Sequence, residues 1–139
     1  MYNHIVLAAD GSENAFRAAK EAVKIASLNT QCLVEIVYVA DFEKAKSEVL
    51  HAGSKEALEL ERRKKIQHVE QLLKEAGISY KVNILHGTPG PEIVKFANDN
   101  YVDLLVIGSR GLNSLQEMVL GSVSHKVIKR VNCPALIIK

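Results

Sequence analysis

The sequence has few aromatic residues, little cysteine and little net charge. Aromatic residues make up 5% of the 139 residues and Trp is absent, although 47% of the chain is hydrophobic. A core of this composition is built mainly from Val, Ile, Leu and Ala, which favours helices packed tightly on a buried sheet. No repeat, low-complexity tract or linker divides the chain, so we expect one domain over residues 1–139.

Cysteine chemistry and membrane insertion are both disfavoured by the sequence. Cys32 and Cys133 stand far apart, with no CxxC pair and no Cys/His cluster, so neither a metal site nor redox chemistry is indicated. We interpret both as buried thiols in a reducing compartment. The chain opens without a basic segment and contains no apolar span of about 18 residues. We therefore expect a cytosolic protein without a membrane partner.

The formal net charge of +2 comes from 18 basic and 16 acidic residues spread along the chain. The densest basic run, Arg-Arg-Lys-Lys at residues 62–65, follows two glutamates, and we interpret it as the solvated face of a helix. A nucleic-acid surface is the alternative. The small net charge and the lack of interleaved aromatics argue against it, so no nucleic-acid partner is expected.

Short apolar runs alternate with segments of helical periodicity, which is typical of a parallel sheet covered on both faces. The run at 80–85 alternates apolar and polar residues and is expected at an edge, whereas the apolar runs 5–9 and 104–107 are expected nearer the centre. The predicted strands are residues 5–9, 32–39, 80–85, 102–107 and 135–138.

Helix starts are predicted near Ser12, near Ser54, at Thr88 and near Gly121. The second of these helices is expected to run without a break to Gly77, where glycine supplies the left-handed geometry of a helix end. Residues 41–53 fit either a loop or an extra helix. This alternation of strands and helices predicts a doubly wound α/β fold, for which we expect strand order 3-2-1-4-5 and a ligand crevice between strands one and four.

Two loops that border this crevice carry the candidate chemistry. Residues 108–111 read Gly-Ser-Arg-Gly, and residues 121–124 read Gly-Ser-Val-Ser at the head of the last helix. Glycines let N–H groups approach an anion, the hydroxyls of Ser122 and Ser124 add donors, and a helix start is electropositive. Together these features predict a phosphate cradle. Asp10, on the opposite lip, could accept hydrogen bonds from a ribose or base, or hold a magnesium ion that bridges phosphates.

Other residues near the crevice leave alternatives open. Arg110 has a donor fork that suits phosphate, but exposure on the surface is equally compatible with its position. His125 is interpreted as a solvent-facing residue. The apolar residues at 115 and 118–120 would either pack against the core or form a flap or partner contact.

Competing nucleotide and phosphate motifs are excluded by spacing. GxxxxGK[ST] is absent, and the first strand-to-helix turn lacks GxGxxG. A phosphatase that used Asp10 as its nucleophile would want a second carboxylate at position 12, which is serine.

The layout of Gly108, two residues, Gly111, nine residues and then Gly121-Ser122 resembles the ATP-binding motif of the universal stress protein family. The resemblance covers almost the whole chain. Residues 6–12 are similar to the family's opening strand and Asp-x-Ser turn, residues 37–39 to its second strand, residues 87–93 to its mid-chain helix start, and residues 132–138 to its closing strand.

This resemblance implies a Rossmann-like, three-layer αβα fold and bound ATP, with magnesium near Asp10. One departure is that Ala8 stands where Pro is frequent in the ATP-binding branch. When the family's binding residues are carried over by position, Ala8, Asp10 and the backbone of Val39 would flank the adenosine. Ile107 and Gly108 would line its ribose side. The phosphates would be held by Gly111, Gly121, Ser122, Val123 and Ser124.

The resemblance also implies a stress protein that changes its interactions with a protein partner according to nucleotide state, without catalytic residues. A homodimer through the last strand is expected, using Ala135, Leu136, Ile137 and Ile138. One alternative is a homodimeric protein of the same fold that does not bind ATP. Another is a very slow ATP hydrolase, for which Glu117 would be the candidate base.

Overall fold

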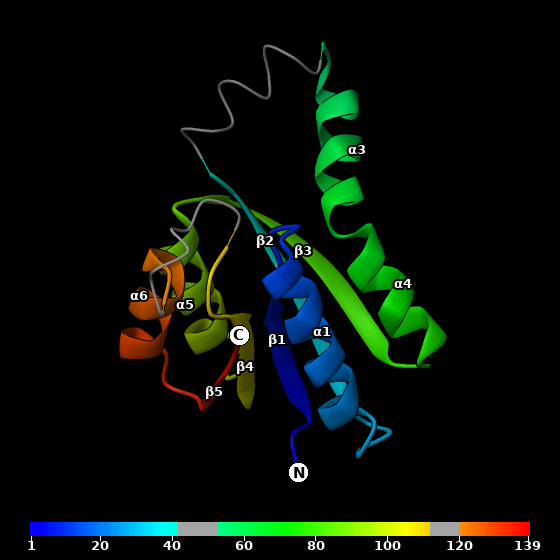
Figure 1. Ribbon diagram of the computed structural model, residues 1–139, viewed down its shortest axis with the longest axis vertical. Coiled ribbons are helices and arrows are strands. Elements are labelled where there is room, and N and C mark those ends of the chain that lie inside the picture. Colours follow the sequence, from blue (N-terminus) through cyan, green and yellow to red (C-terminus); the bar gives the residue numbers. More distant parts are fainter. Residues whose placement is uncertain (42–52, 112–119) are drawn as a thin grey trace.

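A parallel β-sheet lies between two layers of helices (Figure 1). The structure is a computed structural model that describes residues 1–41, 53–111 and 120–139. Within these ranges the sheet has five strands in the order β3-β2-β1-β4-β5, as expected. The strands are β1 (His4–Ala8), β2 (Leu33–Asp41), β3 (Ser79–Gly87), β4 (Leu104–Gly108) and β5 (Ala135–Ile138). The α/β fold class, the edge position of β3 and the inner positions of β1 and β4 are confirmed.

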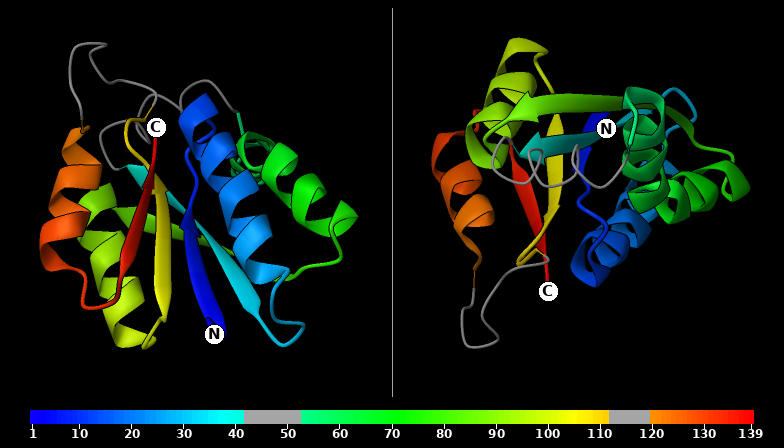
Figure 2. Two further views of the ribbon diagram at one scale, coloured as in Figure 1. Left: turned by 60° about the horizontal axis from the view of Figure 1, so that its bottom comes forward. Right: turned by 90° about the horizontal axis from the view of Figure 1, so that it is seen from above.

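Different helices cover the two faces of the sheet (Figure 2). Helices α1 (Glu13–Ala26) and α4 (Gln67–Glu75) cover one face, and helices α5 (Pro89–Asp99) and α6 (Ser122–Arg130) cover the other. Along β1, Ile5 and Leu7 belong to the first core cluster and Val6 to the second, and all three are 0% exposed. Since neighbouring strands are parallel, their carboxyl ends meet at one edge of the sheet, and the crevice opens there.

Helix α1 lies close to the sheet because its buried face is made of small residues. It begins as expected at Ser12, whose Oγ accepts a hydrogen bond of 3.1 Å from the N–H of Ala15. Alanine side chains let the helix approach the strands and the loop after β4. The buried alanines of this helix are Ala15, Ala18, Ala19, Ala22 and Ala26.

The expectation of one unbroken helix from Ser54 to Gly77 is wrong. Helix α3 (Lys55–Lys65) ends before Ile66, and α4 follows it. Ile66 has φ −108° and ψ 2°, its N–H donates to the carbonyl of Arg63, and its side chain is fully buried. Burial of Ile66 accompanies the turn that lets α4 pack on α1 and β3. With no proline or glycine at the break, the sequence carries no local signal for it.

The basic run at 62–65 is not a solvated face along its whole length, contrary to expectation. Arg62 is only 4% exposed, and its Nη1 lies 3.1 Å from Nε2 of His86 on β3. Lys65 turns toward β2, where its Nζ donates to the hydroxyl of Tyr38 at 3.3 Å. Two of the four basic side chains therefore help to dock α3 on the sheet.

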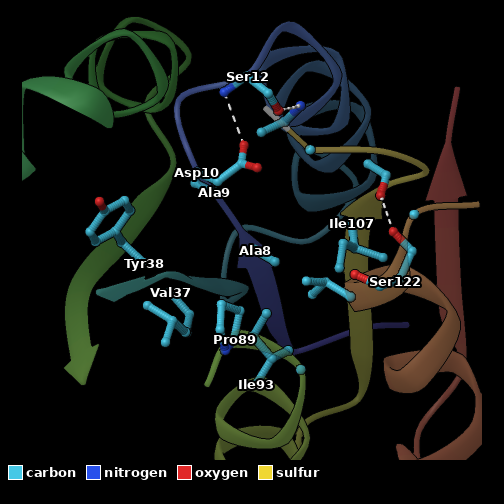
Figure 3. A pocket seen from close by; sticks show the side chains of 18 of the residues that line it. Ala8, Ala9, Asp10, Ser12, Val37, Tyr38, Pro89, Ile93, Ile107 and Ser122 are labelled. Carbon is cyan, nitrogen blue, oxygen red and sulfur yellow. Dashed lines mark hydrogen bonds between the residues drawn. The ribbon is translucent and has the colours of Figure 1, made fainter. Parts of the chain in front are cut away.

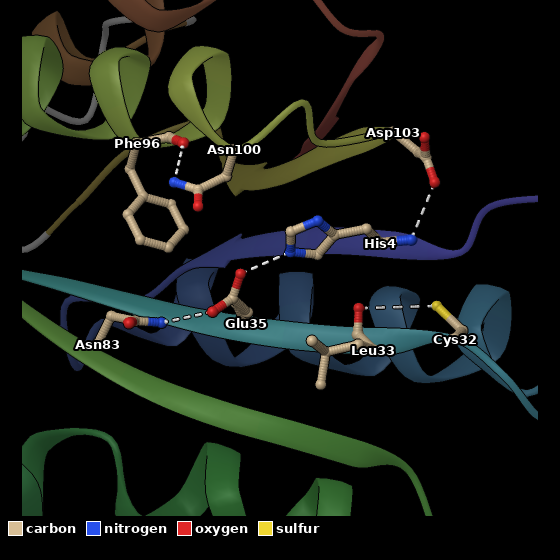
Figure 4. A network of polar contacts seen from close by, with 8 residues as sticks. All are labelled: His4, Cys32, Leu33, Glu35, Asn83, Phe96, Asn100 and Asp103. Atoms are coloured by element: carbon tan, nitrogen blue, oxygen red, sulfur yellow. Dashed lines mark hydrogen bonds and ion pairs between the residues drawn. The ribbon is translucent and has the colours of Figure 1, made fainter.

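A buried carboxylate lies near the amino ends of the strands, away from the crevice (Figure 4). Glu35 of β2 is 9% exposed, and its Oε2 lies 2.6 Å from Nε2 of His4 on β1. Its other oxygen accepts from Nδ2 of Asn83 on β3 at 3.2 Å. Both oxygens thus have partners, as a buried carboxylate requires, and the three inner polar residues tie β1, β2 and β3 together.

Both cysteines are free thiols, and burial raises the pKa of each. Cys32 is buried as expected. Cys133 is only half-buried, because it lies just before β5 at the edge of the sheet.

Some expectations fall on residues 42–52 and 112–119, which lie outside the described ranges. One of these expectations is that the segment after β2 forms either a loop or an extra helix. The others concern Glu117 and the apolar residues at 115, 118 and 119. Among the described residues, no helix has both the length and the apolar character that crossing a bilayer requires.

Candidate functional site

A pocket of about 540 Å³ opens at the carboxyl edge of the sheet, between β1 and β4 (Figure 3). Its volume is within the range of about 300–1,000 Å³ that is usual for small-molecule sites. The structure brings every candidate residue of the sequence analysis to its wall: Ala8, Asp10, Val39, Ile107, Gly108, Arg110, Gly111, Gly121, Ser122, Val123 and Ser124.

One end of the pocket is the start of α6. Gly121 is its N-cap residue and has no side chain to cap the first turn. The amides of Ser122 and Val123 therefore point out of the helix start without acceptors in the helix, and they carry the positive end of its dipole. Helix α1 differs, because Ser12 caps it from within the protein. This end of the pocket is suited to an anion.

The Ser124 hydroxyl has a different role from the expected one. Ser124 is 3% exposed, and its Oγ donates toward the carbonyls of Gly108 at 2.8 Å and Ser109 at 3.0 Å. A hydroxyl has one proton to donate, and these acceptors belong to the last residue of β4 and the first residue of the loop that follows it. Ser124 therefore holds that loop against α6, where we had expected its hydroxyl to donate to a phosphate.

The two lips of the crevice meet at Asp10 and Gly111. The Oδ1 atom of Asp10 accepts a hydrogen bond of 2.9 Å from the N–H of Ser12, which fixes the carboxylate at the start of α1. A methyl group on Gly111 would lie 2.5 Å from the Oδ2 atom of Asp10. Glycine at position 111 thus leaves room for the carboxylate to lie across the crevice beside the second loop.

The other end of the pocket is apolar. Ala8 and Val37 line it from the sheet, and Pro89 and Ile93 line it from α5, whereas Ile107 lies beside Ser122 (Figure 3). Proline has no N–H, and α5 has prolines in its first turn, so this helix start presents few donors. Its surface suits the flat face of a base better than an anion.

Residues at the start of α5 were missed as site residues, although the helix start itself was predicted. The available signal was positional, since Gly87 ends β3 at the same edge of the sheet as the crevice. Gly87 has φ 147°, and a methyl group there would lie 2.8 Å from Cγ of Glu92, so the chain turns tightly into α5. The residues that this turn brings to the pocket are Thr88, Pro89, Gly90 and Ile93.

The rim of the pocket carries charges of both signs. Arg110 is half-buried on the loop after β4 and lines the pocket. This position agrees with the interpretation that its donor fork serves the site, one of the two that the sequence allows. Lys65 and Lys126 line it from α3 and α6, and neither was anticipated as a site residue. His125 is exposed on α6, as expected.

A magnesium ion fits this site only together with phosphates. Among the described residues, no group of three or more His, Cys, Asp or Glu side chains is arranged to hold a metal. Asp10 supplies one carboxylate at the lip. Magnesium is commonly held by one or two carboxylates together with substrate phosphates and water, so Asp10 suits an ion that arrives with a polyphosphate.

Comparison with known proteins identifies the family. The family model described as "Universal stress protein family" matches residues 1–139. Universal stress protein MJ0531 of Methanocaldococcus jannaschii is 34% identical, and the match covers 100% of this chain and 83% of that protein.

Two solved structures extend the comparison to the fold. That of hypothetical protein MJ0577 has a TM-score of 0.86 and 36% identity, covering 100% of this chain and 96% of that one. MJ0577 is a universal stress protein of the same organism. A universal stress protein solved in complex with cAMP has a TM-score of 0.72 and 25% identity, covering 99% and 96% of the two chains. The chain belongs to the universal stress protein family.

Proposed function

We propose that the protein binds ATP in the crevice between β1 and β4 and acts as a nucleotide-dependent regulatory module. The observation that carries this proposal is the division of one pocket into an apolar end and an end rich in N–H donors. A nucleotide has the same division, with a flat base at one end and an anionic chain at the other. The relative that was solved in complex with cAMP supports an adenine nucleotide as the ligand.

In this proposal the base lies at the apolar end, against Ala8, and contacts the backbone of Val39, while Ile107 and Gly108 line the ribose side. Asp10 accepts from the ribose hydroxyls. The phosphates lie over the start of α6, where amide donors and the helix dipole stabilise negative charge. The residues proposed to hold them are Gly111, Gly121, Ser122 and Val123, with Arg110 at the rim and Ser124 holding the loop.

Magnesium is proposed to accompany the nucleotide, with the phosphates as its main ligands and Asp10 as its protein ligand. The ion would neutralise part of the phosphate charge beside the Asp10 carboxylate. Without it, an anionic carboxylate near a triphosphate would weaken binding.

The protein is proposed to hold ATP rather than to turn it over rapidly. Within the described part of the pocket wall, the carboxylates are Asp10 and Asp41. We assign neither as a base that orients an attacking water, as hydrolysis would require. Contacts that stabilise bound ATP and its transition state equally do not speed the chemical step. We therefore expect turnover well below the usual enzyme median of about 10 per second.

The wider role rests on the same proposal. A single cytosolic domain would form a homodimer through β5 and change its contacts with a protein partner when ATP is bound. A universal stress protein that forms this dimer without binding ATP is the competing function. The absence of any nucleotide effect on the protein would favour it.

The test is the thermal stability of the protein with and without Mg-ATP. A ligand that binds only the native state at about a hundred times its dissociation constant stabilises it by roughly 2.7 kcal/mol, so the melting temperature should rise. AMP and cAMP, compared with ATP, would show how much of the affinity the β- and γ-phosphates contribute. No shift with millimolar ATP, and no nucleotide in the purified protein, would contradict the proposal.

Gly121→Val locates the binding site in the same assay. The first added carbon would meet Cα of Arg110 at 3.5 Å and the carbonyl of Ser109 at 3.6 Å, which are ordinary contacts. The two further methyl groups would crowd the space over the start of α6. We expect this variant to fold and to lose ATP binding, with Gly121→Ala as its control. Binding of ATP by Gly121→Val at the level of the native protein would place the phosphates elsewhere.

A further inference from the structure

Two buried polar side chains meet behind the pocket, on the side of α1. Asn14 is 9% exposed and Ser109 is 3% exposed, and Nδ2 of Asn14 donates to Oγ of Ser109 at 3.2 Å. Ser109 lies between pocket residues Gly108 and Arg110, but neither Asn14 nor Ser109 lines the pocket. Their contact joins the first turn of α1 to the loop after β4.

Ser109 makes several of the hydrogen bonds that hold this loop. Its N–H donates to the carbonyl of Ile138 on β5 at 2.6 Å, and its own carbonyl accepts from the N–H of Gly121 at 2.7 Å. The Ser124 hydroxyl donates toward that carbonyl as well. The position of Ser109 therefore sets where α6 begins relative to the loop.

Arg17 orients the Asn14 amide. One turn along α1, Nη2 of Arg17 donates to Oδ1 of Asn14, and Nε of Arg17 donates to the main-chain oxygen of Lys139 at 2.9 Å. Because the amide oxygen is taken by the guanidinium, the amide nitrogen is the atom that faces Ser109. A continuous series of hydrogen bonds thus runs from the end of β5 through α1 to the start of α6.

We propose that Asn14 is a positioning residue of the nucleotide site. It holds Ser109, and through Ser109 it fixes the spacing between the loop at 108–111 and the first amides of α6. Arg17 extends this support to the end of β5. A cradle that is ordered before the ligand arrives loses less conformational entropy on binding. This inference rests on the proposed function for the identity of the ligand, but the ordering of the loop can be measured without any ligand.

The experiment compares Asn14→Leu with the native protein. Leucine branches at Cγ as asparagine does and cannot hydrogen-bond, but it is larger, so Ser109→Ala is needed to remove the same bond without added bulk. A neutral hydrogen bond contributes roughly a fivefold factor, so we expect Mg-ATP to bind about fivefold more weakly by titration calorimetry. In nucleotide-free protein, we expect faster amide hydrogen exchange at Gly121, while exchange at Val6 of β1 stays unchanged. General destabilisation would instead speed exchange at both amides.

Ser109→Ala removes the other partner of the same bond and should give the same two effects. The double variant should bind ATP no more weakly than either single variant, because the bond can be lost only once. Should Asn14→Leu fail to fold, Ser109→Ala decides the question alone. Additive losses in the double variant would mean that the two residues act separately, which would overturn the proposal.

Asn98→Leu is the matched control. Asn98 also ties a helix to a loop with two hydrogen bonds, donating to the carbonyl of Arg130 at 3.2 Å and accepting from the N–H of Asn132 at 2.8 Å. It lies near the end of α5, away from the pocket, so its loss should lower stability and leave ATP affinity unchanged.

The two proposals fail in distinguishable ways. If the native protein does not bind ATP, the proposed function fails, and exchange at Gly121 still tests Asn14. If ATP affinity and Gly121 exchange both survive in Asn14→Leu, the positioning role is wrong while nucleotide binding stands.

Discussion

Gly108 lies directly against Asn14, with no space between them for a side chain. A methyl group on Gly108 would lie 2.8 Å from Cβ of Asn14, 3.0 Å from its carbonyl carbon and 3.1 Å from its carbonyl oxygen. Two of these three atoms are backbone atoms of α1, so they cannot move without moving the helix. The close approach of α1 to the end of β4 therefore depends on glycine at position 108.

Gly108→Ala is expected to lower the free energy of unfolding by about 1–3 kcal/mol, the usual effect of overpacking a rigid site. Urea denaturation measures this change. Gly121→Ala is the control, since the carbon added there has contacts of 3.5 Å and longer. Equal urea midpoints for the two variants would mean that α1 shifts at little energetic cost to make room for the methyl group. That result would contradict the prediction.

The order of the sheet could be predicted because hydrophobic pattern and chain connectivity both constrain it. Strands 5–9 and 104–107 are apolar on both faces, which fits only inner positions in a parallel sheet. The alternating pattern at 80–85 fits an edge. Once the strand order is known, the rule that ligands bind at the carboxyl edge of such a sheet locates the crevice. The glycine-containing loops after β1 and β4 must then line it.

What could not be predicted depends on contacts between distant segments. The break at Ile66 reflects how α4 docks on α1, and no residue near it disfavours a helix. The burial of Glu35 within an apolar strand requires the partners His4 and Asn83 from two other strands. Asn14 reads as an ordinary first-turn residue in the sequence, because its role depends on where Ser109 lies in space.

The ion pair between Arg63 and Glu70 spans the break between α3 and α4. Nε and Nη2 of Arg63 donate to the two carboxylate oxygens of Glu70 at 3.0 and 2.8 Å, and the hydroxyl of Tyr80 donates to one of them at 3.3 Å. The hydrogen bonds from Arg63 hold the pKa of Glu70 below its ordinary value of 4.5. The Glu70 side chain is 11% exposed and the Arg63 side chain 54% exposed, so solvent screens part of the pair.

Glu70→Gln should destabilise the protein in a pH-dependent way. A carboxyl group whose pKa is lowered by folding stabilises the native state above its ordinary pKa, and this stabilisation is lost as pH falls through the native value. We therefore expect the gap in unfolding free energy between native protein and variant to be constant near neutral pH and to narrow below about pH 5. Arg63→Gln should show the same narrowing. A gap that stays constant down to about pH 3 would contradict this assignment.

Tyr101 occupies a backbone conformation that favours glycine. It follows the last turn of α5 with φ 51°, and its side chain is largely in solvent, with the residue 88% exposed. The N–H of Val102 donates to the carbonyl of Ala97, which is the hydrogen bond of a helix end closed by a left-handed residue.

Tyr101→Gly is expected to raise the free energy of unfolding by about 0.5–1 kcal/mol, because glycine adopts this conformation without steric cost. Thermal denaturation measures the change. Tyr101→Ala is the matched control, since it removes the aromatic ring but keeps the Cβ atom and so should gain nothing. An equal gain in both variants would assign the effect to the exposed ring and not to the backbone.

Among the described strands, β5 pairs with β4 on one side only, and the hydrogen bonds between these two strands identify which amides of β5 face outward. The N–H of Leu105 donates to the carbonyl of Pro134, and the N–H of Ser109 donates to the carbonyl of Ile138. In a parallel ladder these groups alternate along the strand. Leu136 and Ile138 therefore direct their backbone groups to β4, whereas Ala135 and Ile137 direct theirs to the open edge.

Ile137→Pro should convert the proposed homodimer into a monomer while the fold is kept. Proline at this position removes an N–H that points away from β4, so the ladder within the subunit retains its bonds and the pairing of two β5 edges loses one. Ile137→Thr keeps both the N–H and the branched side chain and should remain dimeric, whereas Leu136→Pro should unfold the edge of the sheet itself. Sedimentation equilibrium measures the mass, and circular dichroism checks the fold. A monomer of 15.3 kDa for the unaltered chain at tens of micromolar would refute the dimer. A dimer that survives Ile137→Pro would mean that the interface lies elsewhere than β5, because two strands cannot pair through an edge that has lost its central donor.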